Sequence, residues 1–158
     1  MRAREGEIMR MKIDFCVYGD PVGKGRPKFS TVNGHAVAYT PKKTANYETL
    51  VQLAYQQKYG GQSFDKDVKL KAEITAFFSI PKSTSKKKRE EIFRGNIKPT
   101  KKPDCDNIAK VVLDALNKVA YYDDSQIVRL MVQKLYSDEP CVIVHIWEDD
   151  GNDSQNDG

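Results

Sequence analysis

The sequence lacks the features that define several common classes of protein. No apolar stretch approaches the ~20 residues that a membrane-spanning helix needs, and the charged N-terminus has no apolar core of the kind found in signal peptides. The three cysteines are isolated from one another, without a C-x-x-C pair, and the two histidines show no zinc-ligand spacing. We therefore expect a cytoplasmic protein of a reducing compartment, with no membrane or zinc association.

Internal repeats and long low-complexity linkers are also missing, and 158 residues suffice for one domain with a single core. Alternating and helical apolar patterns predict a single α+β domain, in which two main helices pack on a mixed β-sheet. We place this domain at residues 11–148, between a flexible N-terminus at residues 1–10 and an acidic disordered tail at residues 149–158.

Local patterns predict the elements of this domain. Apolar and polar residues alternate over residues 12–18 and 68–79, which indicates two strands. Thr44 is a suitable N-cap for a helix running to about Lys58, and Asn33-Gly34 favours a tight hairpin turn. We also expect a short helix around residues 84–94 and a closing hairpin formed by residues 127–136 and 141–147.

Charge is spread unevenly along the chain, whose net charge is only +4. Residues 82–102 contain nine basic side chains and two acidic ones, whereas residues 148–158 contain five acidic side chains and no basic one. A basic run by itself is a weak indication of nucleic-acid binding, because most such runs are simply solvated. The basic run supports nucleic-acid binding only if chemically active residues lie beside it.

Acidic residues crowd around one predicted helix, in the stretch KPDCDNIAKVVLDAL at residues 102–116. Its apolar residues recur at helical spacing and cover one face, so Asp106, Lys110 and Asp114 form a row on the opposite face. These three residues are spaced for ion pairs, and an acid suits the start of a helix. Capping explains only one carboxylate of Asp104 and Asp106, whereas two close carboxylates repel unless a cation lies between them.

Oxygen ligands of this kind suit Mg²⁺ or Mn²⁺. An EF-hand calcium loop is excluded because Ala109 stands where that loop requires glycine. Beside a basic segment, bound Mg²⁺ can activate water and neutralise charge on a phosphate, and a lysine can stabilise the same charge. These are the parts of a metal-dependent nuclease. A nucleic-acid-binding module and a purely structural acidic helix start are the alternatives.

The stretch PDCDNIAKVVLDALN, followed by DDSQIV at residues 123–128, resembles the RusA family of Holliday-junction resolvases. The family pattern is D-x-D-N, a lysine four residues after the second aspartate, D-A-L, and then an aspartate pair before a small residue, glutamine and an aliphatic residue. Upstream, GDPVGKGRPKF and YTPKKTANYETLV are similar to many phage and prophage members. The resemblance spans about residues 13–147, which identifies residues 11–148 as a RusA-like endonuclease domain.

This resemblance implies a Mg²⁺-dependent crossover junction endodeoxyribonuclease, with Mn²⁺ as a possible substitute. It implies a homodimer that binds branched DNA and resolves four-way junctions by paired incisions in recombination and repair. Asp104, Asp106 and Asp124 carry over as metal ligands, with Asp123 as the alternative third acid, and Lys110 carries over as the catalytic lysine. Asp114 is interpreted as structural. We expect the surrounding basic residues to bind DNA phosphates: Lys24, Arg26, Lys28, Lys86, Lys87, Lys88, Arg89, Lys101 and Lys102.

Two other functions compete with this interpretation. A nuclease of another class is suggested by Pro103-Asp104, but restriction-type nucleases need an acid-x-lysine triplet on a neighbouring strand, and we find none placed after Asp104. A non-catalytic branched-DNA-binding protein would keep the basic segment but would need no acid cluster.

Overall fold

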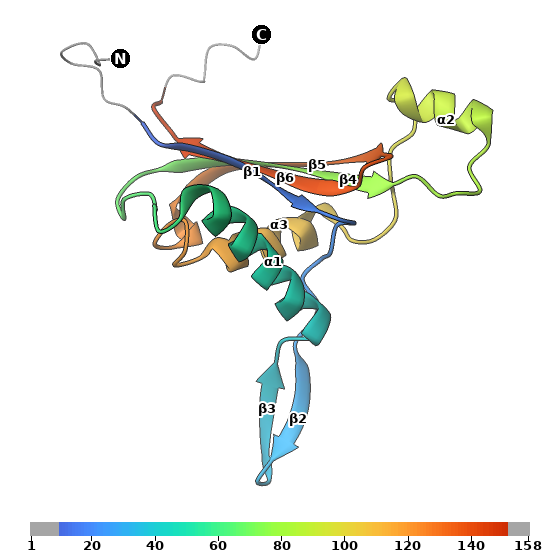
Figure 1. The fold of residues 1–158 in the computed structure, drawn as a ribbon. Helices are drawn as coiled ribbons and strands as arrows, with labels where there is room; N and C mark the ends of the chain where they lie inside the picture. The colour runs from blue at the N-terminus through green and yellow to red at the C-terminus, as the bar shows by residue number, and fades with distance from the viewer. Residues whose placement is uncertain (1–9, 152–158) are drawn as a thin grey trace, which may run out of the picture.

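The computed structural model describes residues 10–151 (Figure 1). The expectations for residues 1–9 and 152–158, a flexible N-terminus and a disordered tail, lie outside the described residues. The elements follow in the order β1 (Lys12–Tyr18), β2 (Lys28–Val32), β3 (His35–Tyr39), α1 (Lys42–Tyr59), β4 (Leu70–Ser79), α2 (Lys86–Phe93), α3 (Cys105–Leu116), a 3-10 turn (Asp124–Gln126), β5 (Ile127–Ser137) and β6 (Cys141–Glu148). Within residues 10–151, no helix is long and apolar enough to cross a membrane.

The main sheet has four strands in the order β1-β6-β4-β5. Strand β6 pairs antiparallel with both β1 and β4, whereas β5 pairs parallel with β4. The predicted closing hairpin is therefore wrong, because β4 lies between β5 and β6. The parallel pairing follows from the long connection through α2 and α3, since parallel neighbours need a crossover rather than a tight turn. The prediction of an α+β domain with a mixed sheet is confirmed.

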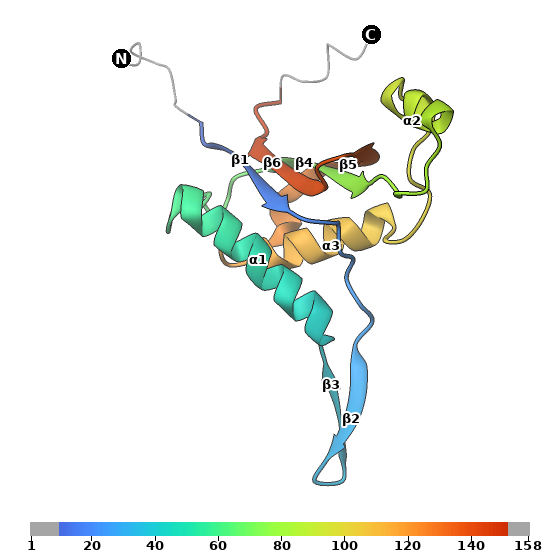
Figure 2. The ribbon, with the colours of Figure 1, turned by 45° about the vertical axis from the view of Figure 1, so that its right-hand side comes forward.

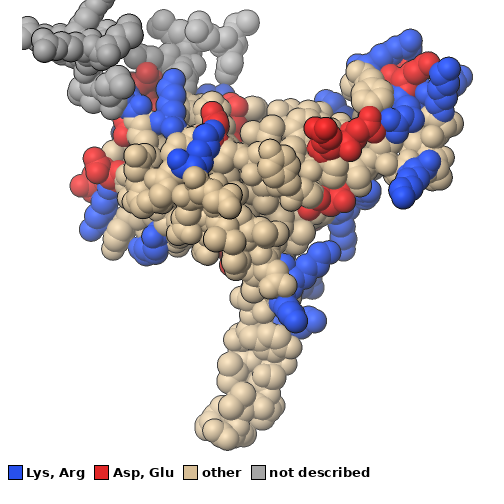
Figure 3. All heavy atoms as spheres, viewed as in Figure 1, with Lys and Arg blue, Asp and Glu red and all other residues tan. Residues whose placement is uncertain are grey.

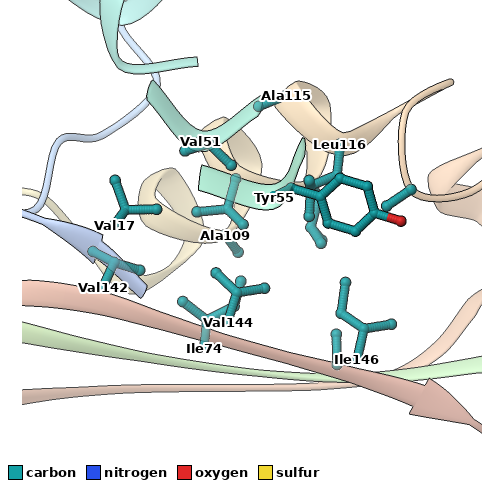
Figure 4. Packing of buried hydrophobic residues seen from close by; sticks show 14 of the residues in the cluster. Val17, Val51, Tyr55, Ile74, Ala109, Ala115, Leu116, Val142, Val144 and Ile146 are labelled. Atoms are coloured by element: carbon teal, nitrogen blue, oxygen red, sulfur yellow. The ribbon is translucent and has the colours of Figure 1, made fainter. Parts of the chain in front are cut away.

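Helices α1 and α3 both pack on the same face of this sheet (Figures 1 and 2). The alternation of β1, β4 and β6 sends their apolar side chains toward the helices, so that Ile74, Val144 and Ile146 meet Val51 and Leu116 in the core (Figure 4). Seven of the twelve residues of α3 are buried, which fixes the helix against the sheet and turns its polar row outward.

Strands β2 and β3 form a separate two-stranded hairpin that projects from the body of the protein (Figure 1). All ten strand residues are exposed. The predicted Asn-Gly turn is confirmed, since Asn33 has φ 51° and Gly34 has φ 78°, the positive values that a tight hairpin turn needs. An isolated two-stranded hairpin gains little stability from its own contacts.

Helix α1 begins three residues earlier than the sequence predicted. Pro41 occupies the N-cap position, and Thr44 lies buried in the first turn. The Thr44 hydroxyl oxygen instead accepts a hydrogen bond from the backbone N–H of Gly25 at 2.9 Å. Thr44 therefore ties α1 to the loop between β1 and β2 rather than capping its own helix.

Candidate active site

The N-terminal end of α3 carries the first two predicted acids. Asp104 is the N-cap residue, and its carbonyl accepts the first helical hydrogen bond from Ile108 at 3.0 Å. Its carboxylate makes no capping hydrogen bond to the helix, although capping was the structural explanation for an acid here. Asp104 and Asp106 are both exposed, so both carboxylates face solvent at the positive end of the helix.

Lys110 lies one turn after Asp106 on the same exposed face of α3. The two ion pairs that its spacing suggested, with Asp106 and with Asp114, are not found among the described residues. Asp114 instead lies 3.3 Å from the Nζ atom of Lys24. Lys110 is therefore an exposed side chain without an ion pair among the described residues.

A groove of about 610 Å³ opens beside Asp104. It runs between the loop that follows β1, the start of α1 and the N-terminal end of α3. Three predicted DNA-binding residues line it, namely Lys24, Arg26 and Lys102, together with Lys43. The groove therefore joins one carboxylate of the predicted site to four basic side chains.

The two glycines around Lys24 allow the walls of this groove to approach each other. A Cβ atom at Gly23 would lie 2.7 Å from Cβ of Pro103, and one at Gly25 would lie 2.9 Å from Oγ1 of Thr44. Between them, the backbone N–H of Lys24 donates to the carbonyl of Asn107 at 3.0 Å. The G-K-G sequence thus anchors the loop to both helices.

Lys24 itself makes two contacts with acids inside the protein. Its Nζ atom lies 2.6 Å from Oε1 of Glu48 and 3.3 Å from Oδ2 of Asp114. Burial lowers the pKa of Lys24, but the hydrogen bonds and charges of the two carboxylates outweigh it, so the pKa is raised overall. The phosphate contact of Lys24 stays a prediction. Its ammonium already contacts Glu48 of α1 and Asp114 of α3.

The aspartate pair lies at the opposite end of α3. The Asp123 carboxylate accepts a hydrogen bond from the backbone N–H of Ser125 at 2.9 Å and forms a capping box with Gln126. These hydrogen bonds lower the pKa of Asp123. Desolvation, the neighbouring Asp123 and the charge of Asp114 raise the pKa of Asp124. Asp123 is therefore engaged in local structure, whereas Asp124 lies beside the carboxylates of Asp123 and Asp114.

The three predicted metal ligands do not converge within one chain. Asp114 follows Asp106 by eight residues, about 12 Å along the helix axis, and Asp124 is influenced by Asp114 rather than by the first pair. Among residues 10–151, no group of three acidic, histidine or cysteine side chains is placed to hold a metal ion. A single chain therefore brings Asp104 and Asp106 together but separates them from Asp124.

The remaining predicted DNA-binding residues occupy three places. Lys28 begins the projecting hairpin and is exposed, and Lys101 and Lys102 precede α3. Lys86, Lys87 and Lys88 form the exposed first turn of α2. Arg89 contacts both carboxylate oxygens of Asp138, at 2.9 and 3.1 Å. Basic side chains gather over α2 and at the base of the hairpin (Figure 3).

Sequence reasoning gave no role to three residues of this region, although Asn107 belongs to the D-x-D-N motif. Lys43 lines the groove, Asn107 lines it and accepts the Lys24 hydrogen bond, and Glu48 neutralises Lys24. The paired lysines that begin α1 were a signal for Lys43. Nothing in the sequence indicated that Glu48 meets Lys24, because that contact depends on how α1 packs against the loop.

Comparison with known proteins connects this arrangement to a family. The profile described as "Endodeoxyribonuclease RusA" matches residues 18–147. The chain is 42% identical over 138 residues to "Uncharacterized protein YqaN" of Bacillus subtilis (strain 168), covering 86% of this chain and 96% of that protein. It is 30% identical over 141 residues to "Crossover junction endodeoxyribonuclease rusA" of Lactococcus phage r1t, covering 89% and 99%. The chain belongs to the RusA family of endodeoxyribonucleases.

Proposed function

We propose that this endodeoxyribonuclease resolves Holliday junctions by paired incisions, with Mg²⁺ as its cofactor, during DNA recombination and repair in the cytoplasm. Membership of the RusA family and the similarity to a phage crossover junction endodeoxyribonuclease support the reaction. The observation that carries the proposal is the exposed N-terminal part of α3, with Asp104, Asp106 and Lys110, beside a groove lined by basic residues.

The basic groove and the carboxylates have separate tasks in this proposal. Arg26, Lys43 and Lys102 attract the phosphates of a DNA arm and position the backbone without reading its sequence. Lys110 lies one turn from Asp106, where its ammonium can stabilise the negative charge that develops when a phosphodiester is attacked. Lysine suits this task because its charge is compact and sits on a flexible stem.

Mg²⁺ is the proposed cofactor because the available donors are carboxylate oxygens, which hard divalent cations prefer. Mn²⁺ takes the same ligands and is the expected substitute. When bound, the cation would supply activation of water and neutralisation of phosphate charge. Asp104 and Asp106 can supply only part of a ligand set, since Asp124 lies at the other end of α3.

We propose a homodimer because resolution requires two cuts on opposing strands. A four-way junction is close to two-fold symmetric, and a two-fold dimer presents two identical sites related by the same operation. One chain has a single set of the predicted acids. A monomer would therefore nick one strand and would have to rebind before the second cut.

The direct test is incubation of a labelled four-way junction with the protein, with and without Mg²⁺, beside a duplex of the same sequence. We expect metal-dependent paired cuts in the junction and little cutting of the duplex. Binding without cutting in every divalent metal would favour a non-catalytic branched-DNA-binding protein. Equal cutting of junction and duplex would favour a nuclease of different selectivity.

A further inference from the structure

Two lysines from separate segments meet over one aromatic ring at the C-terminal end of α3. The Nζ atom of Lys118, which follows the helix, lies 3.5 Å from the centroid of the Tyr122 ring. The Nζ atom of Lys66, in the loop between α1 and β4, lies 4.7 Å from the same centroid. The fold therefore holds two ammonium groups close together, although they come from distant parts of the chain.

The two lysines face a pocket that contains little to neutralise them. The pocket has a volume of about 350 Å³ and is lined by Ser63, Phe64, Asp65, Lys66, Lys118, Tyr121 and Tyr122. Asp65 is an acid in this lining, yet within residues 10–151 neither lysine forms an ion pair with it or with another carboxylate. Two positive charges thus border an open pocket without a counter-charge in contact.

Hydrogen bonds fix this pocket to the turn that carries the aspartate pair. The backbone N–H of Phe64 donates to the carbonyl of Ala120 at 2.8 Å, which joins the Lys66 loop to the segment after α3. The side-chain amide of Gln126 donates to the carbonyl of Val68 at 3.0 Å. Gln126 belongs to the 3-10 turn that begins with Asp124. The pocket and Asp124 are therefore parts of one connected structure.

Lys118 stands at a backbone position where lysine is uncommon. Its φ is 65°, in the left-handed region that favours glycine and asparagine. Its backbone N–H donates to the carbonyl of Tyr121 at 2.9 Å, which closes the turn. Glycine would form the same turn without strain, so the turn does not explain the lysine. The feature that glycine would lack is the charge, which also lowers the pKa of nearby Asp123.

We propose that Lys66 and Lys118, supported by the ring of Tyr122, bind phosphate groups of the DNA backbone beside Asp124. The face of an aromatic ring attracts a cation, but two neighbouring ammonium groups repel each other unless an anion lies between them. A phosphodiester group supplies that anion, and such contacts hold the backbone without reading its sequence.

This pocket extends the DNA-binding surface to the second end of α3. The groove with Arg26, Lys43 and Lys102 lies beside the N-terminal end of the helix, next to Asp104. Lys66 and Lys118 provide positive charge beside the aspartate pair at the C-terminal end. The inference rests on the proposed function, because it assumes that DNA is the ligand.

The test measures junction binding by Lys66→Ala and Lys118→Gly without divalent metal, so that cutting cannot interfere. Fluorescence anisotropy over a series of salt concentrations gives the slope of log affinity against log salt. We expect each variant to bind more weakly and its slope to become shallower by up to about 0.9 for each DNA phosphate no longer neutralised. Lysines that only pack on Tyr122 would leave this slope unchanged.

Two controls separate loss of a phosphate contact from other effects. Lys69→Ala removes an exposed lysine of the same loop that does not line the pocket, and we expect it to keep the wild-type slope. The midpoint of thermal unfolding of Lys118→Gly should stay close to that of the wild type, because glycine adopts this φ without strain. Weaker binding by Lys118→Gly would then not result from unfolding.

Tyr122 is expected to act as a positioning residue for the two lysines. Tyr122→Phe keeps the aromatic face and should retain the wild-type affinity and salt slope. Tyr122→Leu removes that face and should weaken junction binding, because both ammonium groups lose the surface that orients them. Equal affinities for the two variants would show that the ring does not position the lysines.

The outcomes separate this inference from the nuclease function. An unchanged salt slope in either Lys66→Ala or Lys118→Gly, beside a wild-type protein that binds and cuts the junction, would overturn the two-lysine site and leave the nuclease standing. An equally shallow slope for Lys69→Ala would do the same, because the effect would then be one of overall charge. A wild-type protein that neither binds nor cuts a junction would overturn both.

Discussion

The two ends of α3 carry the same kind of residue in different surroundings. At the N-terminal end, Asp104 and Asp106 are exposed, and Asp104 makes no capping hydrogen bond to the helix. At the C-terminal end, Asp123 caps a 3-10 turn and Asp114 is paired with Lys24. Desolvation and the neighbouring carboxylates of Asp123 and Asp114 raise the pKa of Asp124.

This difference separates acids that stabilise the fold from acids that are open to a ligand. An aspartate with hydrogen bonds or a cationic partner is accounted for by local structure. An aspartate that faces solvent at a helix start gains only the weak interaction with the helix dipole, and one that lies against other carboxylates is repelled by them, so a bound cation would stabilise both. By this criterion Asp104, Asp106 and Asp124 form one class, although the fold places them at opposite ends of a helix.

The largest expected effects come from removing the predicted metal ligands. Asp106→Asn and Asp124→Asn should each lower the cutting rate by at least about 100-fold, since even residues outside the direct ligands of a metal commonly change activity by 10–100-fold. Junction binding should survive, because less negative charge cannot weaken attraction to phosphates. Single-turnover cleavage and gel-shift titrations measure the two quantities separately.

Asp123→Ala is the matched control for Asp124→Asn, because it removes an acid at the same end of α3. We expect it to retain most of the cutting rate, since the Asp123 carboxylate already accepts a hydrogen bond from Ser125. If Asp123→Ala is inactive while Asp124→Asn is active, Asp123 is the third acid. The inference that a hydrogen-bonded aspartate has only a structural role would then be wrong at this end of α3.

Lys110→Met should lower the single-turnover rate by about 100- to 1,000-fold, the usual cost of losing one group that stabilises transition-state charge. Its effect on junction affinity should be small, because one ammonium among many contributes little to phosphate attraction. Rates at saturating protein and affinities from titration make the comparison. Weaker affinity with an unchanged saturated rate would show that Lys110 is an ordinary phosphate contact.

Substitution of Lys24 tests whether its acidic partners, Glu48 and Asp114, stabilise the fold. Lys24→Met leaves Glu48 and Asp114 without their partner and should lower the free energy of unfolding by about 1 kcal/mol, a modest value because the groove is open to water. Arg26→Met, in the same groove, should leave stability nearly unchanged. Because folding raises the pKa of Lys24, its stabilisation is present at neutral pH and is lost only as the pH rises above about 10. Urea unfolding of both variants at pH 7 and pH 10.5 measures their free energies of unfolding. Equal losses of stability for Lys24→Met and Arg26→Met would contradict the structural role of Lys24.

The smallest effect concerns the basic turn of α2, which lies away from both ends of α3. Replacing Lys86, Lys87 and Lys88 with alanine should leave the saturated cutting rate intact. The slope of log affinity against log salt should become shallower by up to about 0.9 for each DNA phosphate that these lysines no longer neutralise on a duplex arm. An unchanged slope would mean that these three lysines are a solvated surface.

Much of the fold was predictable from the sequence because the signals are local. Apolar alternation revealed the strands, helical spacing revealed α3 and its polar row, and Asn33-Gly34 revealed the hairpin turn. The pairing of strands was not predictable in the same way. Strands β5 and β6 follow each other closely in sequence, yet β4 lies between them, because pairing is decided by which edges the long crossover leaves available.

The same difference between local signals and long-range contacts applies to the candidate site. The sequence by itself determined that Asp104, Asp106 and Lys110 lie at one exposed helix end, because Asp104 and Asp106 are two residues apart at the helix start and Lys110 follows Asp106 by about one turn. It also determined the family, through a motif of neighbouring residues. Only the tertiary structure decided that Lys24 is neutralised by Glu48 and Asp114, and that Asp124 lies at the far end of α3. Those facts depend on contacts between segments distant in the chain, which no local pattern encodes.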